Sequence, residues 1–447
     1  MARLSSILLF LCLFSFSVQA QTSTRLLDSM VNLYAQLKEF NGSVLVAQKG
    51  KVLLEKGYGY KDVAQKTKVD ANSLFQYGSV TKQFTSALIM YLQEKGKLSI
   101  QDKLSKYFPQ LPFADSVTIY NLLTHTSGIF NYTNNPEFMK TEAVKPASKE
   151  KIFALFQNKP LEFMPGSKFS YSNSGYSLLG YIIEKASGKP YERLVHEVIL
   201  KPIGMKTAGF DFANNHSADK TTGYNFIKND KFEVAGIVDS SVAYAAGALY
   251  GSVKDLYAWH QALQKNKLLT SASWQQVYTP FHSKYAFGWQ IDTVFGKPVA
   301  EHGGGIFGYT SMIKRFPKDD VVIIVLSNNS SPKSQELANN LAALVFQQPV
   351  EWPKKKIFMQ VPEEKLKAYT GDYEIMPNFV ITISLENGKL MGQPTGQGKT
   401  ELLAENENKF YVEAADADVS FVKDASGKVI ALKLTQAGRT MEGKKVK

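Results

Sequence analysis

Residues 75–96 (FQYGSVTKQFTSALIMYLQEKG) constrain the fold more than any other stretch of this sequence. Apolar side chains recur along it at three- and four-residue spacing, at Phe84, Leu88, Ile89 and Leu92. This spacing predicts a helix with one apolar face, and Gly96 after the last apolar residue predicts where that helix ends. The stretch is therefore predicted to form a buried helix, with Ser79 at or near its first turn.

Ser79 and Lys82 lie three residues apart at the start of this helix, so their side chains share a face and can meet. A serine hydroxyl is a poor nucleophile until a neighbouring group takes its proton. A lysine can take that proton once burial lowers its pKa. The helix start also offers backbone N–H groups and a positive dipole end, which favour a developing negative charge. The turn is therefore predicted to hold a nucleophile, its base and part of an oxyanion site.

The Ser79–Lys82 spacing is not unique in the chain. S-x-x-K also occurs at Ser148–Lys151, Ser217–Lys220, Ser311–Lys314, Ser330–Lys333 and Ser420–Lys423. A single match of this kind is more often a chance pair on the surface. Ser79 differs because a glycine precedes it, an apolar helix follows it, and two further motifs accompany it.

The first twenty residues have the pattern of a targeting segment. Arg3 is followed by the apolar run 7–16 and then by Val18-Gln19-Ala20, which predicts a signal peptide over residues 1–20 that is cleaved after Ala20; an uncleaved anchor is the alternative. Cys12 is the only cysteine, so the mature chain would carry neither a disulfide nor a thiolate. We expect an exported protein, periplasmic or secreted, without a transmembrane anchor after cleavage.

Length and charge set broader limits. A chain of 447 residues predicts two or three structural units, and a hydrophobic content of 44% is ordinary for a globular protein. The formal net charge of +12 would suit a nucleic-acid binder. Export and the scatter of the lysines favour a solvated surface instead, with attraction to anionic cell-envelope polymers, so no nucleic-acid partner is expected.

The predicted secondary structure changes near residue 349, from mixed helices and strands to short strands. Before that point, helices are expected at 117–123, 150–157, 175–187, 253–263 and 334–346, and strands at 42–48, 52–55, 286–291, 309–315 and 321–326. Residues 349–362 are rich in proline and lysine, a composition that predicts a linker. Beyond them, short strand-like runs alternate with turns, and Ile430, Leu432 and Leu434 are expected on one face. We expect a signal peptide over 1–20, a hydrolase domain over 21–348, the linker, and a small barrel-like β-domain over 363–447.

Two further motifs carry polar groups suited to catalysis. In Tyr171-Ser172-Asn173, a tyrosine hydroxyl beside a lysine can move protons, and an asparagine amide can bind a substrate carbonyl. The alternative is a loop tyrosine that packs on the core.

In the second motif, His302-Gly303-Gly304-Gly305, the glycines allow a ligand to come close to the backbone. The Gly305 N–H is predicted to be a second oxyanion donor beside the Ser79 N–H.

Other kinds of chemistry find no support in the sequence. Residues 303–308 match G-x-G-x-x-G, but a strand is expected after them rather than a helix, which argues against dinucleotide binding. The sequence contains no G-x-S-x-G, Walker or H-E-x-x-H motif. The remaining histidines are scattered and read as structural or solvated. No cofactor and no metal site are predicted.

The order S-x-x-K, Y-x-N, H-x-G resembles the serine β-lactamase and penicillin-binding protein superfamily, in its class C-like branch of β-lactamases, esterases and DD-peptidases. Supporting stretches are 122–129 (LLTHTSGI), 163–173 (FMPGSKFSYSN), 202–205 (PIGM), 245–256 (AAGALYGSVKDL), 285–289 (YAFGW) and 326–328 (LSN). The resemblance implies an α+β fold, with an antiparallel sheet flanked by helices plus a helical subdomain. The tail from Tyr369 more loosely resembles a lipocalin-like domain.

The resemblance also implies roles for the residues of the motifs. Ser79 would attack the substrate carbonyl, and Lys82 and Tyr171 would share the proton transfers, with either as the first base. Asn173 would orient the substrate, opposite a wall formed by His302 and Gly305. The implied function is an exported serine hydrolase that cleaves small-molecule ester or peptide substrates through an acyl-enzyme; an oligomer is compatible with it. The alternatives are a DD-carboxypeptidase or β-lactamase acting on cell-wall peptides or β-lactams, a non-catalytic penicillin-binding-like sensor, and a structural envelope protein.

One residue departs from the pattern of these relatives. Gly303 stands where they carry the threonine of K-T-G or H-T-G. That threonine can donate a hydrogen bond to a substrate carboxylate, and glycine cannot. The sequence therefore predicts weaker recognition of carboxylate-bearing substrates, unless His302 or Arg315 binds the carboxylate instead.

Overall fold

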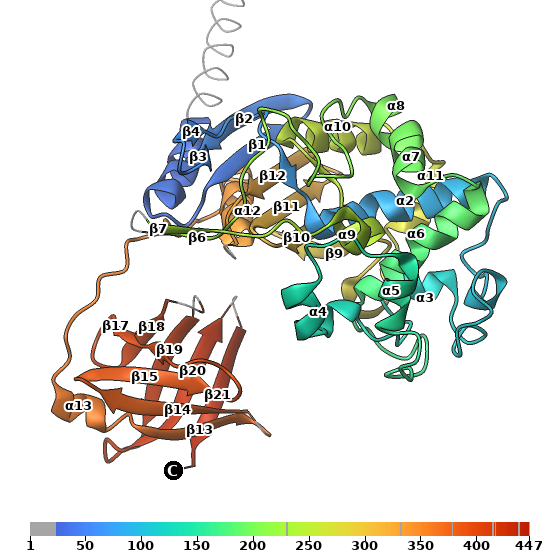
Figure 1. Cartoon of the computed structure of the whole chain (residues 1–447). Coiled ribbons are helices and arrows are strands. Elements are labelled where there is room, and N and C mark those ends of the chain that lie inside the picture. The colour runs from blue at the N-terminus through green and yellow to red at the C-terminus, as the bar shows by residue number, and fades with distance from the viewer. Residues whose placement is uncertain are drawn as a thin grey trace, which may run out of the picture. The chain divides into compact units, whose positions relative to one another are not determined.

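The computed structural model describes residues 24–446 except 229–230, 331–332, 378, 414, 416 and 437–438. The expected signal peptide lies outside these residues. The chain divides into two compact units between Pro353 and Lys354, and both are visible in Figure 1. In the part of the chain that is described, none of the helices has both the length and the apolar character that a bilayer span requires.

The first unit is built on a six-stranded antiparallel sheet. Its strands, in spatial order, are β2 (Lys51–Tyr58), β1 (Gly42–Gln48), β12 (Val321–Ser327), β11 (Tyr309–Phe316), β10 (Lys297–Ile306) and β9 (Gln290–Val294). Every residue of β12 is buried, and its alternate side chains enter two different cores, as Ile323 and Ile324 illustrate. A strand covered on both faces reads as an unbroken apolar run, which is why β12 was predictable.

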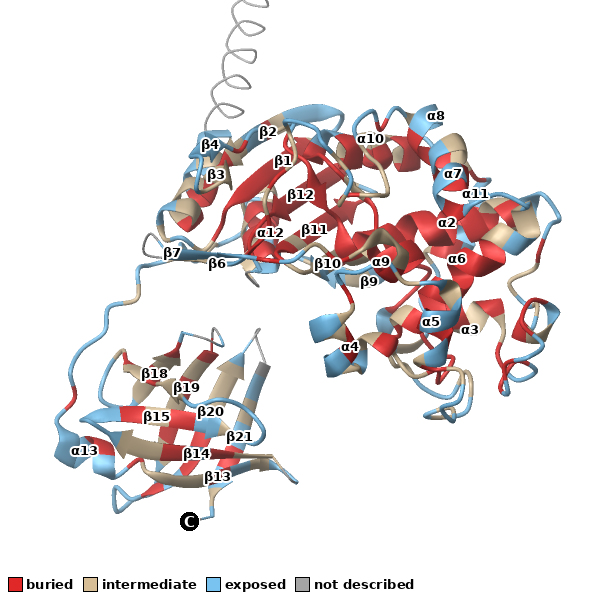
Figure 2. Ribbon diagram, in the orientation of Figure 1, coloured by how far each residue is buried: buried red, intermediate tan, exposed pale blue. Residues whose placement is uncertain are grey.

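Helices cover both faces of this sheet (Figure 2). A helix over residues 24–36 and α12 (Lys333–Val345) pack on one face around the smaller core, which includes Leu27, Tyr34 and Leu341. α2 (Thr81–Glu94) and α10 (Val253–Gln264) belong to the larger core on the other face. Burial of an apolar face on each side favours this layered arrangement.

The larger core continues into a mainly helical region (Figure 1). Its helices are α3 (Ile119–Leu123), α4 (Pro136–Thr141), α5 (Lys149–Ala154), α6 (Asn173–Ser187), α7 (Tyr191–Val195), α8 (Lys201–Ile203), α9 (Ser240–Gly247) and α11 (Ser271–Val277). Single turns form η1 (Gly78–Val80), η2 (Leu104–Lys106), η3 (Tyr132–Asn134), η4 (His196–Leu200) and η5 (His282–Lys284). α6 ends at Gly188, whose φ is +72°, directly after the helix expected at 175–187. The expected fold class is confirmed: an antiparallel sheet flanked by helices, with a helical subdomain.

Several elements of the first unit differ from the sequence-based expectation. The strand expected at 286–291 is wrong over most of its length, because residues 286–289 form a turn and β9 begins only at Gln290. Gly288 makes that turn with φ of +73°, and a Cβ there would lie 2.6 Å from Lys82 O. The tight packing on α2 therefore replaces strand pairing.

Short strands were also missed. The pairs are β3 (Tyr60–Asp62) with β4 (Thr67–Lys68), β5 (Phe75–Gln76) with β8 (Tyr250–Gly251), and β6 (Tyr224–Lys228) with β7 (Lys231–Val234). β10 was missed as well, although it contains the whole motif from His302 to Gly305. Three successive glycines carry no periodic signal, so only pairing with β11 makes this stretch a strand.

The second unit is a nine-stranded antiparallel sheet that curls around one core in a nearly closed barrel (Figure 1). Its elements are α13 (Glu363–Lys367), β13 (Gly371–Met376), β14 (Phe379–Glu386), β15 (Lys389–Pro394), β16 (Thr400–Glu401), β17 (Leu403–Ala404), β18 (Lys409–Val412), β19 (Ala417–Lys423), β20 (Val429–Gln436) and β21 (Arg439–Lys445). The expected small all-β C-terminal domain is confirmed. The expected common face of β20 is wrong at Ile430, which is 44% exposed. A β-bulge opposite Val422 and Lys423 breaks the two-residue alternation there.

Candidate active site

Ser79 lies on η1, a single 3₁₀ turn that leads directly into the 14-residue helix α2. Gly78 precedes it with φ of +54°, a left-handed conformation that glycine adopts without steric strain. This glycine turns the chain from β5 into the helix. Ser79 therefore stands at the N-terminal end of a buried helix, as its sequence predicts.

The turn that carries Ser79 is held tightly against the sheet. Ser311 Oγ on β11 donates a hydrogen bond of 2.7 Å to Tyr77 O. A Cβ at Gly304 on β10 would lie 2.0 Å from Tyr77 O and 3.1 Å from Ser79 N. Only glycine allows this close approach, so Gly304 fixes how near β10 comes to the backbone of Ser79.

Lys82 is fully buried one turn after Ser79. Its Nζ lies 3.0 Å from Ser79 Oγ, 2.8 Å from Asn173 Oδ1 and 2.8 Å from Ala246 O. No carboxylate is among these contacts. Burial lowers the pKa of Lys82 well below its usual value, which favours the neutral amine that a base requires.

The partners of Lys82 also determine which way its lone pair points. Asn173 Oδ1 and Ala246 O are carbonyl oxygens, so they can only accept hydrogen bonds. A neutral amine has two N–H donors, and both are used by these two acceptors. The remaining direction faces Ser79 Oγ, where the lone pair can accept the hydroxyl proton.

Tyr171 approaches Ser79 from another side. Its hydroxyl donates a hydrogen bond of 2.9 Å to Ser79 Oγ, and burial raises its pKa well above the usual range. A tyrosine in that state keeps its proton. The two pKa directions together favour Lys82 as the proton acceptor and Tyr171 as the proton donor.

Asn173 is the first residue of α6, and its side chain is held at both ends. Its Oδ1 accepts from Lys82 Nζ, and its Nδ2 donates to Thr133 Oγ1 at 3.1 Å. Its backbone N–H donates to Asn131 Oδ1 at 3.0 Å. The amide orientation is therefore fixed, and the second Nδ2 hydrogen can bind a substrate carbonyl.

His125 also belongs to this cluster, with the structural role that was one of the two expected for the histidines outside the H-x-G motif. It is buried, and its Nδ1 accepts a 3.1 Å hydrogen bond from Ser172 N. Its ring centroid lies 4.1 Å from that of Tyr171. Burial lowers its pKa well below the usual value, so the ring is neutral. The His125 ring packs against the ring of Tyr171 and binds the backbone next to it. The only sequence signal for this role was the T-H-T-S-G stretch, which contains His125.

His302 lies on β10 with both ring nitrogens engaged. Its Nδ1 lies 2.6 Å from Gly303 O, which can only accept, so Nδ1 carries the proton. Its Nε2 then accepts from Tyr285 OH at 2.8 Å. Burial and the nearby Lys82 lower the pKa of His302 to about 4. His302 therefore supports the wall beside Tyr171 rather than lining the cavity described below.

Gly305, two residues further along β10, does face the cavity. A Cβ there would meet no other atom within 4 Å, whereas a Cβ at Gly78 would lie 3.0 Å from Gly305 N. The Gly305 N–H is thus close to the turn that carries Ser79 N–H. An oxyanion site needs two backbone donors beside the nucleophile, and the closeness of Gly305 N to this turn agrees with its predicted role as one of them.

Other candidates from the sequence lie elsewhere. Arg315 is 1% exposed, and its guanidinium donates to Tyr278 OH, Gln264 Oε1 and His260 Nδ1. It therefore cannot be the carboxylate-binding group considered above. Ser148 is the N-cap of α5, which gives that S-x-x-K match a structural role.

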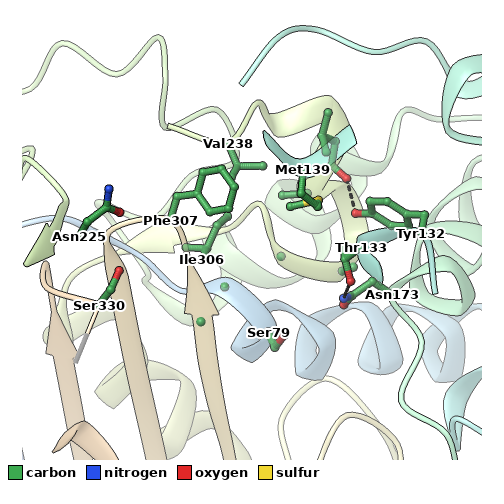
Figure 3. A pocket seen from close by; sticks show the side chains of 16 residues that line it. Ser79, Tyr132, Thr133, Met139, Asn173, Asn225, Val238, Ile306, Phe307 and Ser330 are labelled. Carbon is green, nitrogen blue, oxygen red and sulfur yellow. Dashed lines mark hydrogen bonds between the residues drawn. The ribbon is translucent and has the colours of Figure 1, made fainter. Parts of the chain in front are cut away.

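A cavity of about 370 Å³ opens beside Ser79 (Figure 3). Its lining residues are Gly78, Ser79, Tyr132, Thr133, Met139, Asn173, Asn225, Val238, Val242, Ala243, Ala246, Gly247, Gly305, Ile306, Phe307 and Ser330. Ser79, Asn173 and Gly305 from the three sequence motifs thus meet in one cavity. Within the described residues, no group of three or more His, Cys, Asp or Glu side chains is placed to hold a metal ion.

Comparison with known proteins gives a consistent picture. A family model described as Beta-lactamase matches residues 30–347, and a domain of unknown function, DUF3471, matches residues 355–446. The chain is 29% identical over 431 residues to Penicillin-binding protein 4* of Bacillus subtilis, which covers 90% of this chain and 94% of that protein.

Two solved structures share the fold. One is the octameric penicillin-binding protein homologue from Pyrococcus abyssi, with a TM-score of 0.65 and 25% identity over 94% of this chain and 99% of that chain. The other is a penicillin-binding protein from Bacillus halodurans, with a TM-score of 0.63 and 25% identity over 71% of this chain and 98% of that chain. The first of these resembles both units, because it covers nearly the whole chain.

Proposed function

This chain belongs to the beta-lactamase family, and on that premise we propose that it is a serine hydrolase that forms an acyl-enzyme on Ser79 and cleaves ester or amide bonds. The observation that carries the proposal is the contact of Ser79 Oγ with both Lys82 Nζ at 3.0 Å and Tyr171 OH at 2.9 Å. A nucleophile within reach of a depressed-pKa amine and a protonated phenol has the groups that acyl transfer needs.

In the proposed first step, Lys82 takes the Ser79 proton as Oγ forms a bond to the substrate carbonyl carbon. Charge develops on the carbonyl oxygen, and the N–H groups of Ser79 and Gly305 stabilise it. The bond to the leaving group then breaks, and Tyr171 gives its proton to the departing atom. The proton held by Lys82 restores Tyr171, so the acyl-enzyme forms with both groups in their starting states.

In the proposed second step, a water molecule takes the place of the leaving group. Lys82 receives a proton through Tyr171, which takes one proton from the water as it gives up its own, and the water oxygen attacks the acyl carbon. The bond to Ser79 Oγ breaks, and the proton held by Lys82 passes to the serine. Asn173 stays in position throughout, because Lys82 and Thr133 hold its amide at both ends.

The experiment that tests this proposal is covalent labelling with a fluorophosphonate, read by intact mass and by peptide mapping. We expect one label on Ser79, and we expect Ser79→Ala to abolish both labelling and ester hydrolysis. Ser148→Ala serves as the control, because Ser148 has only a capping role. Labelling that persists in Ser79→Ala, or that maps to Ser148 or Ser330, would refute the assignment.

A second candidate activity is acylation by β-lactams or by cell-wall peptides that end in D-alanine. What favours it is the similarity to proteins named penicillin-binding protein. Gly303 argues for weak recognition of the carboxylate that these substrates carry. A non-catalytic sensor would be labelled on Ser79 but would not turn over ester or amide substrates, so substrate turnover by the unlabelled protein separates the enzyme from the sensor.

Export and assembly belong to the same proposal. The signal-peptide pattern of residues 1–20 supports a periplasmic or secreted enzyme, and cell fractionation tests it. The octameric homologue supports an oligomer, which light scattering of the purified chain can measure.

A further inference from the structure

Among the described residues that line the cavity beside Ser79, none has a side chain that is charged at neutral pH. Its polar groups come from serine, threonine, asparagine and tyrosine, and burial raises the pKa of Tyr132 well above its usual range. A charged substrate group placed there would lose its hydration without gaining an opposite charge. The inference that follows rests on the proposed function of Ser79.

The middle of this cavity is apolar. In Figure 3, Met139, Val238, Ile306 and Phe307 lie together between two polar ends. Asn225 and Ser330 form one end, and Tyr132, Thr133 and Asn173 form the other.

These apolar walls come from segments that are tied together. Tyr132 OH donates a 2.6 Å hydrogen bond to Val242 O and so joins η3 to α9. Ile306 and Phe307 lie at the turn between β10 and β11, and both pack against the larger core. The cavity is therefore a preformed space rather than a gap between independent loops.

The position of the proton donor tells which part of the substrate enters the cavity. A donor must lie beside the leaving atom that it protonates. Tyr171 contacts Ser79 Oγ but is not among the residues that line the cavity. The leaving group therefore departs on the Tyr171 side, and the cavity holds the part that stays on Ser79.

We propose that this cavity binds the acyl group of the substrate and selects an uncharged acyl group with an apolar side chain. The alcohol or amine that leaves makes no contact with Met139, Val238 or Phe307. Specificity of the enzyme is then set on the acyl side, both when the acyl-enzyme forms and when it is hydrolysed.

The first test compares two sets of esters. Nitrophenyl esters of lengthening straight-chain acids vary the acyl group only, and butyrate esters of different alcohols vary the leaving group only. We expect kcat/KM to rise about fourfold for each added acyl methylene until the chain fills the cavity. An ester whose acyl chain ends in a carboxylate or an ammonium should react more slowly than the uncharged ester of equal length.

The second test places a charge in the cavity wall. Met139→Glu should remove the gain from lengthening the acyl chain and should favour an acyl chain that ends in an ammonium. Met164→Glu is the matched control, because Met164 is 79% exposed and does not line the cavity. Both variants should respond to the leaving-group series as the wild type does. Phe307→Ala, which also shortens the apolar wall, gives the same comparison if Met139→Glu is not stably folded.

The outcomes separate this inference from the proposed function. If Ser79→Ala hydrolyses the esters at the wild-type rate, the proposed function is wrong. If hydrolysis depends on Ser79 but does not change with acyl length, or prefers the charged acyl chains, the acyl-pocket inference is overturned while Ser79 keeps its role. Equal behaviour of Met139→Glu and Met164→Glu, with Phe307→Ala like the wild type, would overturn it as well.

Discussion

The amine of Lys82 has three polar neighbours, which are two carbonyl oxygens and one hydroxyl. The carbonyls of Asn173 and Ala246 orient the amine, and the hydroxyl of Ser79 is the one neighbour with a proton to give. Burial without a carboxylate partner lowers the pKa of this lysine. Arginine at this position would stay charged at any accessible pH.

Lys82→Arg should therefore abolish acylation by Ser79 in a protein that is still folded. General-base catalysis contributes about 10²- to 10⁴-fold, and we expect the labelling rate to fall by that factor. Lys151→Arg, at an exposed lysine that pairs with Glu142, is the control. An acylation rate close to wild type in Lys82→Arg would exclude proton transfer by this residue.

The pH dependence of acylation follows from the same shift. A base is active when it has lost its proton, so the rate should rise with pH through the lowered pKa of Lys82 and then level off. The plateau should begin well below the usual lysine pKa of about 10.4. Labelling rates measured from about pH 5 to pH 10 test this, with unfolding followed in parallel. A rate that still climbs steeply at the upper limit would contradict a buried, neutral lysine.

Gly303 is the residue that separates this chain from relatives with a threonine at that position. A hydrogen bond to a charged group contributes roughly 1.5–3 kcal/mol, which corresponds to about ten- to a hundredfold in kcat/KM. We expect wild type to prefer neutral short-chain esters or internal amides over nitrocefin or peptides ending in D-alanine. Gly303→Thr should regain part of the activity on the carboxylate-bearing substrates.

The substitution at Gly303 is sterically mild. A Cβ there would lie 3.2 Å from Met312 Cε, the flexible end of a side chain, so a small adjustment accommodates it. The measurement is kcat/KM of the wild type and of Gly303→Thr on the neutral and on the carboxylate-bearing substrates. Faster hydrolysis of nitrocefin than of esters by the wild type would show that another group binds the carboxylate, and Arg315 is too deeply buried to be that group.

At the scale of elements, the contact between β10 and η1 matters most for the site. β10 brings Gly304 against Tyr77 O and leaves Gly305 facing the cavity. In the proposed oxyanion site, the strand and the helix turn would supply one backbone donor each. Neither element could form the proposed site alone, because the two N–H groups belong to segments separated by more than two hundred residues.

Gly304→Ala should disturb this contact strongly, whereas Gly305→Ala should not. The added methyl at Gly304 would meet the backbone oxygen of Tyr77 at 2.0 Å, and backbone cannot yield as a flexible side chain can. Overpacking of this kind costs about 1–3 kcal/mol, so we expect a lower melting temperature and a lower acylation rate. The Gly305 variant should melt like the wild type. Equal melting temperatures for both variants would show that the close approach is not a constraint.

At the scale of the whole molecule, the chain consists of two units with separate cores. The smaller core of the first unit extends to Val350, which packs against it. The second unit has its own aromatic core around Tyr369, Phe410 and Phe421. The expected domain limits of 21–348, 349–362 and 363–447 remain a prediction.

A chain truncated after Pro353 should therefore fold and keep Ser79-dependent ester hydrolysis. We expect cooperative thermal unfolding near the wild-type temperature, together with a changed substrate range or a changed oligomeric state. Circular dichroism, ester kinetics and light scattering measure these three properties. A truncated chain that does not fold would show that the second unit is required for the stability of the first.

The sequence by itself determined the features that depend on local spacing. Ser79 and Lys82 share a face because they are three residues apart on one helix, and Gly188 ends α6 because it adopts positive φ. β12 was predictable because both of its faces are buried. The order of the three motifs was enough to predict the fold class and the candidate nucleophile.

The tertiary structure decided which groups surround these residues. Ala246 O reaches Lys82 from 164 positions away, and Thr133 holds Asn173 from 40 positions away. β10 becomes a strand through pairing rather than periodicity, and His125 reaches Tyr171 only when α6 packs beside α3. Such contacts join segments distant in sequence, so their formation depends on how helices and sheet pack rather than on any local pattern. The proposed acyl cavity also depends on tertiary structure, because its lining residues come from stretches of the chain that are far apart in sequence, from Gly78 to Ser330.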